Sequence, residues 1–176
     1  MKNERRSNVT KKICFAAIFA AMCCACTLIS IPIPIGYINL GDLMVLTAGW
    51  CLGGGIGAVA AGVGSALADV ILGYVVYSPA TFVIKALVAL AAALVYSVFK
   101  KTIFKNTRDF LPRIISALLA ECVMVGGYFL FEAVFMSYGL AAAASVPLNA
   151  LQGIIGALGA SLIIGKIIFW TKLRKD

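Results

Sequence analysis

The fold depends on the stretch DLMVLTAGWCLGGGIGAVAAGVGSALADVILG, residues 42–73. As one helix these 32 residues would extend about 48 Å, well beyond a membrane hydrocarbon core of about 30 Å. The triplet Gly53-Gly54-Gly55 offers a turn near the middle, because glycine adopts backbone conformations closed to other residues. The stretch therefore fits either one long helix or two short ones, and the rest of the sequence decides between them.

The composition is that of a membrane protein. Hydrophobic residues make up 62% of the chain, charged residues make up 12%, and the mean hydropathy is +1.03. A soluble domain is nearer one half apolar and one quarter charged, so disorder, a coiled coil and an ordinary soluble enzyme are excluded. Six spans would use about 120 of the 176 residues. We therefore predict one integral membrane domain over residues 1–176, with no room for a soluble catalytic domain.

The basic residues favour two helices in the stretch 42–73. Of the 15 Lys and Arg residues, five precede residue 13, five lie in 100–113, four lie in 166–175, and Lys85 stands alone. Two crossings within 42–73 place all three clusters on the same side, which the positive-inside rule makes cytoplasmic. The net charge of +8 is then a topology signal, and no nucleic-acid partner is expected.

We therefore predict an all-α polytopic fold of six transmembrane helices with both termini, 1–12 and 171–176, in the cytoplasm. The two legs within 42–73 are short, so tilting or local thinning of the bilayer is expected. Two prolines prevent the first helix from continuing through 32–41. The predicted spans are 13–31, two within 42–73, 78–99, 110–136 and 146–170, and the outer connections are 32–41, 73–77 and 137–145.

Five charged residues fall inside the predicted membrane region. Each costs several kcal/mol if it faces lipid unpaired, so each should face the bundle interior or a wet cavity. By position, Glu121 lies near mid-depth and the other four lie in the outer half of the membrane. They are Asp42, Asp69, Lys85, Glu121 and Glu132.

Polar and aromatic neighbours of these charges predict a cavity open to the outside. Residues 121, 128 and 132 share one helical face, residues 149 and 152 share another, and the first outer loop adds an aromatic and an amide. Carboxylates, amides, aromatic faces and one ammonium suit a small planar nitrogen-containing ring with hydroxyl groups. The candidate binding residues are Tyr37, Asn39, Lys85, Tyr128, Glu132, Asn149 and Gln152.

Structural roles remain open for most of these groups. Asp42 can cap the helix that follows it, and Asp69 and Lys85 lie at similar depth and can form an ion pair. Glu121 can bond to a neighbouring helix, and the two amides of 146–170 can hold helices together. Each residue is thus either a site residue or part of the scaffold.

Metal and cofactor chemistry is not expected. The chain has no histidine, and all six cysteines lie in apolar stretches, where cysteine usually acts as a small hydrophobic residue. The pair Cys23-x-x-Cys26 could hold a soft metal only in principle. The glycine run 53–57 is not followed by Gly-Lys-Ser/Thr and is no phosphate loop.

The first span carries small residues four apart, Ala16 with Ala20 and Ala17 with Ala21. Such faces let a second helix approach closely. They serve either packing within the chain or docking of a partner protein near the cytoplasmic side.

Four strings give the chain a resemblance to a known family. They are GYINLGD (36–42), GSALAD (64–69), YSPATFVIK (77–85) and PLNALQG (147–153). With them the chain resembles the substrate-binding S components of energy-coupling factor (ECF) vitamin transporters, in the branch of riboflavin, hydroxymethylpyrimidine and pyridoxine carriers. The likeness covers about residues 11–168.

The resemblance implies a six-helix protein of the bacterial cell membrane with a vitamin site near the outer face. It implies that the first-span alanines dock onto a shared transmembrane coupling protein, which two cytosolic ATPases drive. It also implies that the chain topples in the membrane to deliver its substrate, and does no chemistry itself.

Two other functions compete with a vitamin-binding subunit. An intramembrane enzyme with paired carboxylates is disfavoured because histidine and an Asp-rich metal motif are missing. A self-sufficient ion-coupled carrier is disfavoured because inverted repeats are not visible. The favoured ligands are hydroxymethylpyrimidine and pyridoxine, followed by riboflavin, whose larger ring system needs a wider pocket.

Overall fold

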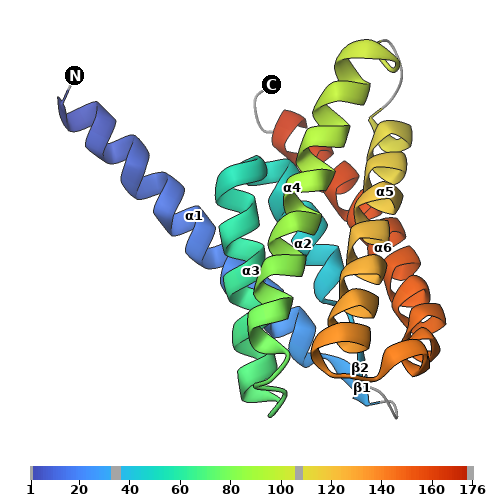
Figure 1. The fold of residues 1–176 in the computed structure, drawn as a ribbon. Helices are drawn as coiled ribbons and strands as arrows, with labels where there is room; N and C mark the ends of the chain where they lie inside the picture. Colours follow the sequence, from blue (N-terminus) through green and yellow to red (C-terminus); the bar gives the residue numbers. More distant parts are fainter. Residues whose placement is uncertain (1, 33–36, 106–108, 174–176) are drawn as a thin grey trace.

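The computed structural model describes residues 2–32, 37–105 and 109–173, and Gly36, the middle of the 100–113 connection and residues 174–176 lie outside them. The α-helices α1–α6 form one bundle, and the first half of α1 extends away from it (Figure 1). Their bounds are α1 Lys2–Leu28, α2 Gly41–Leu52, α3 Gly54–Ile71, α4 Ser78–Thr102, α5 Phe110–Leu130 and α6 Val146–Leu173.

The division of the stretch 42–73 into two helices is confirmed. The chain turns at Gly53, whose φ of +80° lies in the left-handed region that favours glycine. The 12 residues of α2 extend only about 18 Å. In the part of the chain that the structure describes, five helical segments are long and apolar enough to cross a membrane, and α2 is a shorter apolar helix. The structure thus confirms the six helices, while six crossings remain a prediction.

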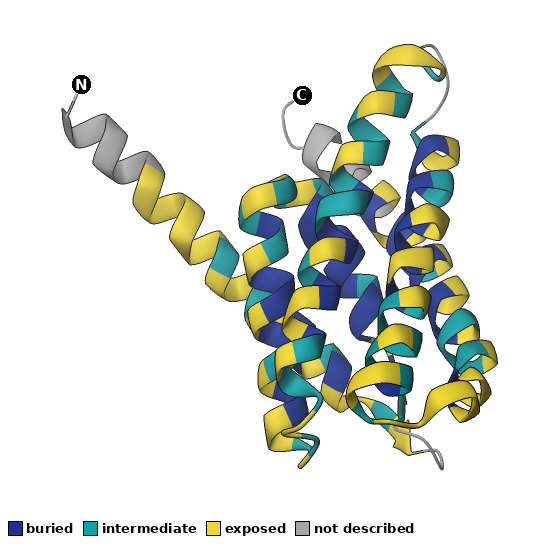
Figure 2. Cartoon of the chain, in the orientation of Figure 1, coloured by how far each residue is buried: buried dark blue, intermediate teal, exposed yellow. Residues whose placement is uncertain are grey.

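The short helix α2 lies at the centre of the bundle, in contact with α1, α3, α4 and α6. The core around it is rich in fully buried alanines, such as Ala89 and Ala117, whereas Phe15 and Leu158 are exposed. Figure 2 shows the buried residues between the helices and the exposed ones on the outside. Small residues inside and large apolar residues outside are typical of helices packed in lipid.

Glycines allow these helices to touch. A Cβ added to Gly49 would lie 2.4 Å from the carbonyl oxygen of Ala89, and one on Gly64 would lie 2.2 Å from that of Ala20. A Cβ on Gly156 of α6 would lie 2.8 Å from the Cβ of Asp42. These contacts bring α4 to α2, α1 to α3, and α6 to α2.

A small hairpin joins α1 to α2. Its strands are β1 Ser30–Pro32 and β2 Tyr37–Asn39, which pair antiparallel with Ser30 opposite Asn39. The prediction that the first helix ends before the prolines is confirmed, but the pairing of the strands was not predicted. Two further elements join α5 to α6, the π-helical turn η1 Phe131–Phe135 and the 3₁₀ helix η2 Gly139–Ser145.

The two ends of the bundle differ. The hairpin, the α3–α4 turn and the α5–α6 connection lie together at the lower end in Figure 1. The beginning of α1, the α4–α5 connection and the end of α6 lie toward the upper end. The segments that carry the three basic clusters therefore share one end, as the predicted topology requires.

Candidate functional site

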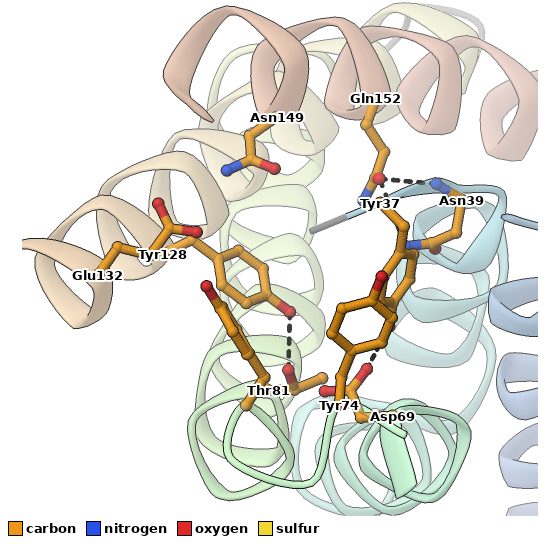
Figure 3. Close-up of a pocket in the computed structure, with 10 residues that line it drawn as sticks. Tyr37, Asn39, Asp69, Tyr74, Thr81, Tyr128, Glu132, Asn149 and Gln152 are labelled. Carbon is orange, nitrogen blue, oxygen red and sulfur yellow. Dashed lines mark hydrogen bonds between the residues drawn. The ribbon is translucent and has the colours of Figure 1, made fainter. Parts of the chain in front are cut away.

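A cavity opens at the hairpin end of the bundle (Figure 3). Its walls come from β2, α3, the α3–α4 turn, α4, α5, η1 and α6. The empty space within it is about 430 Å³ with the open mouth included. The lining residues are Tyr37, Asn39, Asp69, Tyr74, Tyr77, Thr81, Tyr128, Glu132, Asn149 and Gln152.

All the candidate binding residues except Lys85 line this cavity. Asp69, for which a structural role was left open, lines it as well. Lys85 is only 2% exposed and lies among the helices, where its Nζ contacts the sulfur of Met124 at 3.0 Å. The structure therefore brings six of the seven candidates together around the cavity, from β2, α5, η1 and α6, and leaves Lys85 out.

The ion pair that was left open between Asp69 and Lys85 is not observed. Lys85 Nζ donates to Asp42 Oδ1 at 2.5 Å, and both side chains are almost fully buried. Asp42 lies in the first turn of α2, where no side-chain cap forms, so the capping role that was left open for it is not observed either. Because α2 runs through the centre of the bundle, its first turn places this carboxylate inside the core, against α4.

Asp69 instead accepts a hydrogen bond from the hydroxyl of Tyr37 through Oδ1. Burial, and then the nearby Asp69 carboxylate, raise the pKa of the Tyr37 hydroxyl, which therefore stays protonated and donates. Asp69 Oδ2 is buried and has no hydrogen-bond partner among the described residues. One carboxylate oxygen at the cavity wall is thus left without a donor.

The amides of Asn39 and Gln152 are bound to each other. Gln152 Oε1 accepts from the backbone N of Asn39 at 2.8 Å and from its Nδ2 at 3.3 Å. Gln152 Nε2 donates to Asp42 Oδ2 at 2.6 Å, and Asn39 Oδ1 accepts from the backbone N of Gly41 at 2.7 Å. The side-chain amide of Asn149 also lines the cavity, and it makes no hydrogen bond with another side chain in the described part of the chain.

Aromatic rings form much of the remaining wall. The ring centroids of Tyr37 and Tyr74 are 4.9 Å apart, and those of Tyr74 and Tyr77 are 6.4 Å apart. Burial raises the pKa of Tyr77 to about 12, so its hydroxyl stays neutral near pH 7. The sequence reasoning missed Tyr74, Tyr77 and Thr81, although two tyrosines in one short outer connection were a usable signal. Thr81 Oγ1 lies 3.0 Å from the hydroxyl of Tyr128.

Glu132 enters the cavity wall from the π-helical turn η1. A π turn inserts an extra residue into a helix and often occurs at functional sites. Glu132 Oε2 accepts from Ser145 Oγ at 2.5 Å, which ties η1 to the end of η2. Ser145 was also missed by the sequence reasoning, because its segment was expected to be a simple loop.

Glu121 lies deeper in the bundle and does not line the cavity. It is 4% exposed, and neither carboxylate oxygen has a hydrogen-bond partner in the part of the chain that the structure describes. Its side chain packs against Gly153 of α6 instead. The bond to a neighbouring helix that was left open for Glu121 is therefore not observed.

The four alanines of α1 divide into two pairs. Ala16 and Ala20 are half-buried, and the carbonyl of Ala20 lies against Gly64 of α3. Ala17 and Ala21 are exposed. Packing within the chain is thus confirmed for Ala20, while the second pair is left free on the outer face of α1.

These features define a helical membrane protein with a small polar and aromatic binding pocket at one end. The model of the ECF-type riboflavin transporter S component family matches residues 7–168, and the chain therefore belongs to this family. It is 35% identical over 147 residues to a Pyrococcus woesei protein described as an uncharacterized protein in the gap 3′ region, covering 80% of this chain and 92% of that protein.

A solved structure of the S component of a bacterial ECF transporter has a similar fold. The TM-score is 0.72 at 23% identity, over 93% of this chain and 98% of the other. S components are membrane-embedded, substrate-binding subunits for vitamin uptake that associate with an ECF module, and they are transporter subunits rather than enzymes.

Proposed function

We propose that this chain binds a small planar nitrogen-containing ring with hydroxyl or hydroxymethyl groups in the cavity at its hairpin end. Hydroxymethylpyrimidine and pyridoxine are the first candidates and riboflavin is the next. The observation that carries the proposal is the lining of the cavity, which combines tyrosine rings with carboxylate and amide groups.

The polar groups that remain available match such a ring. The Asn149 amide can both donate and accept, so it suits the mixed edge of a nitrogen heterocycle. Asp69 keeps one oxygen without a partner, and Glu132 uses one of its two oxygens on Ser145. Both carboxylates can accept from a hydroxyl or a ring N–H.

The aromatic groups and the size of the cavity favour a flat, small solute. Tyr37, Tyr74 and Tyr77 offer ring faces and edges against which a heterocycle can stack. The empty space of about 430 Å³ includes the open mouth, so the enclosed part of the cavity is smaller and suits a small solute. Riboflavin remains a candidate because the matching family is described by it, although it fills more space than a single substituted ring.

We further propose that the chain works in the cell membrane with a shared transmembrane coupling protein and two cytosolic ATPases, which supply the energy that this subunit does not generate. The exposed pair Ala17 and Ala21 on α1 supports docking of a second helix there.

A thermal-shift screen of the purified protein over B vitamins and their precursors tests the ligand. The expected result is a rise in Tm with hydroxymethylpyrimidine or pyridoxine, with no ion gradient present. Binding that needs an ion gradient would instead favour a self-sufficient carrier.

The position of the site is tested with the vitamin that gives the largest shift. Asn149→Ala removes a polar partner in the cavity wall and should weaken binding about ten- to a hundredfold. Leu151→Ala is the matched control, because this residue lies two positions away on α6 and is exposed on the outside of the bundle. Glu132→Ala should weaken binding to a similar degree. Wild-type affinity in both cavity variants would place the site elsewhere.

A further inference from the structure

A continuous set of polar contacts runs from the centre of the bundle to the hairpin. Lys85 Nζ contacts Asp42 Oδ1 at 2.5 Å, Asp42 Oδ2 accepts from Gln152 Nε2 at 2.6 Å, and Gln152 Oε1 accepts from the Asn39 backbone N at 2.8 Å. The four residues come from α4, α2, α6 and β2, and each is at most 8% exposed. Residues far apart in the sequence are thus joined through buried atoms.

The order of donors and acceptors in this set is fixed at both ends. Asn39 offers two N–H groups to Gln152, so the amide oxygen of Gln152 must face the hairpin. Its NH₂ group must then face inward and needs an acceptor. Asp42 supplies one through its second carboxylate oxygen, while its first oxygen accepts from the ammonium group of Lys85.

The hairpin depends on contacts of this kind. Each strand has only three residues, and an isolated two-stranded hairpin is at best marginally stable. β2 carries Tyr37 and Asn39, and both residues line the cavity. Whatever fixes β2 therefore also fixes one wall of the pocket.

We propose that Lys85, Asp42 and Gln152 are positioning residues that hold β2 in place, with the buried ion pair setting the orientation of the Gln152 amide. Lys85 and Asp42 act through Gln152 and do not touch the substrate. This goes beyond the proposed function, because it assigns a role to Lys85 and Asp42, which do not line the cavity. The role is the same whichever vitamin binds there.

Hydrogen–deuterium exchange of the full chain in detergent, without any vitamin, tests the proposal directly. Gln152→Met removes the contacts to both neighbours, and the pair Asp42→Leu with Lys85→Met removes both charges at once, so that no unpaired charge stays buried. In both variants the backbone amides of residues 37–41 should exchange about ten- to a hundredfold faster than in the wild type.

Two comparisons separate positioning from a general loss of stability. Thr47→Val is the matched control, since it removes a buried hydrogen bond of α2, from Oγ1 to the Leu43 carbonyl at 2.7 Å, that lies outside this set. It should leave exchange at 37–41 unchanged. Exchange within the buried part of α5 away from these contacts, residues 116–120, should also stay at its wild-type rate in all variants.

Wild-type exchange at 37–41 in the Asp42→Leu/Lys85→Met pair would overturn the proposal, as would an equal acceleration in α5. Because no ligand is present, the result stands even if the vitamin screen finds nothing.

Discussion

Lys85 is the largest of the fully buried side chains, and its charge decides which substitutions the core tolerates. Its ammonium contacts Asp42 and lies 5.5 Å from the ring centroid of Tyr128. A cation at such a site needs its carboxylate, because removing one member of a buried pair leaves an uncompensated charge. Asp42 therefore carries the stabilising role that the spacing of the sequence suggested for Asp69.

Asp42→Ala should destabilise the protein much more than Asp69→Ala. Leaving Lys85 unpaired costs about 3–5 kcal/mol, whereas Asp69 loses the hydrogen bond from Tyr37 and no ion pair. Thermal unfolding of both variants in the same detergent gives the comparison. An equal loss of Tm in the two variants, or a larger loss in Asp69→Ala, would show that Lys85 does not depend on Asp42.

Individual residues of the cavity wall could be predicted where charge or amide groups stood inside apolar stretches. That signal identified Glu132, Asn149 and Gln152, because polar groups in a membrane need a reason to be there. It failed for the pairing of Lys85, since depth along a helix does not determine the direction in which a side chain points. It also failed for Tyr74 and Tyr77, because tyrosines are ordinary at a membrane interface.

Among the helices, the long apolar segments were predictable and the irregular ones were not. The start of α6 at Val146 and the break at Gly53 agree with the sequence analysis, because proline, glycine and apolar length mark them. The hairpin has only three residues in each strand, too few for an alternating pattern to show. The π turn at Phe131–Phe135 depends on tertiary contacts, such as the bond between Glu132 and Ser145, and had no local signal.

The contact between α1 and α3 gives a prediction at the scale of these elements. Gly64→Ala should destabilise the protein, because its new Cβ would lie 2.2 Å from the backbone carbonyl of Ala20 and force α1 away. Gly55→Ala in the same helix is the matched control, since a Cβ there meets nothing within 4 Å.

Replacing a helical glycine by alanine without a clash should raise the stability by about 0.5–1 kcal/mol. Unfolding in a series of detergent mixtures measures both variants. If Gly64→Ala were as stable as Gly55→Ala, α1 would not be packed against α3 in this way.

The outer face of α1 gives a second prediction. Ala17→Leu should block vitamin uptake by the assembled transporter while binding by the isolated chain stays intact, because a larger side chain keeps a partner helix at a distance. Uptake by membranes containing the coupling protein and ATPases, with binding measured in parallel, checks it. Ile18→Leu is the control at a neighbouring exposed position and should transport normally.

Ala20→Leu does not test docking cleanly, because Ala20 is half-buried and its backbone meets Gly64. Normal uptake by Ala17→Leu would place the docking face elsewhere on the molecule.

At the scale of the whole molecule, the basic segments and the cavity are separated along the length of the bundle. The segments with the three basic clusters lie toward one end of the bundle, and the cavity lies at the other, beside the hairpin. If the basic end faces the cytoplasm, as the positive-inside rule indicates, the cavity opens to the outside, where a substrate for uptake arrives. The topology therefore decides whether the cavity can serve uptake.

Labelling of single cysteines on intact cells tests this orientation, in a background in which the six native cysteines, Cys14, Cys23, Cys24, Cys26, Cys51 and Cys122, are replaced. Leu140→Cys lies in η2 at the cavity end and is 89% exposed, so a membrane-impermeant maleimide should label it from outside. Asn106→Cys lies between α4 and α5, outside the described residues, and should react only after the cells are permeabilised.

The two positions report on the stretch 42–73. If α2 and α3 together cross the membrane twice, the α4–α5 connection stays on the cytoplasmic side with the amino terminus. If they crossed once, that connection would face outward and Asn106→Cys would react on intact cells. Labelling of position 106 from outside would refute six crossings with cytoplasmic termini. It would also place the cavity on the cytoplasmic side, where it could not receive a substrate for uptake.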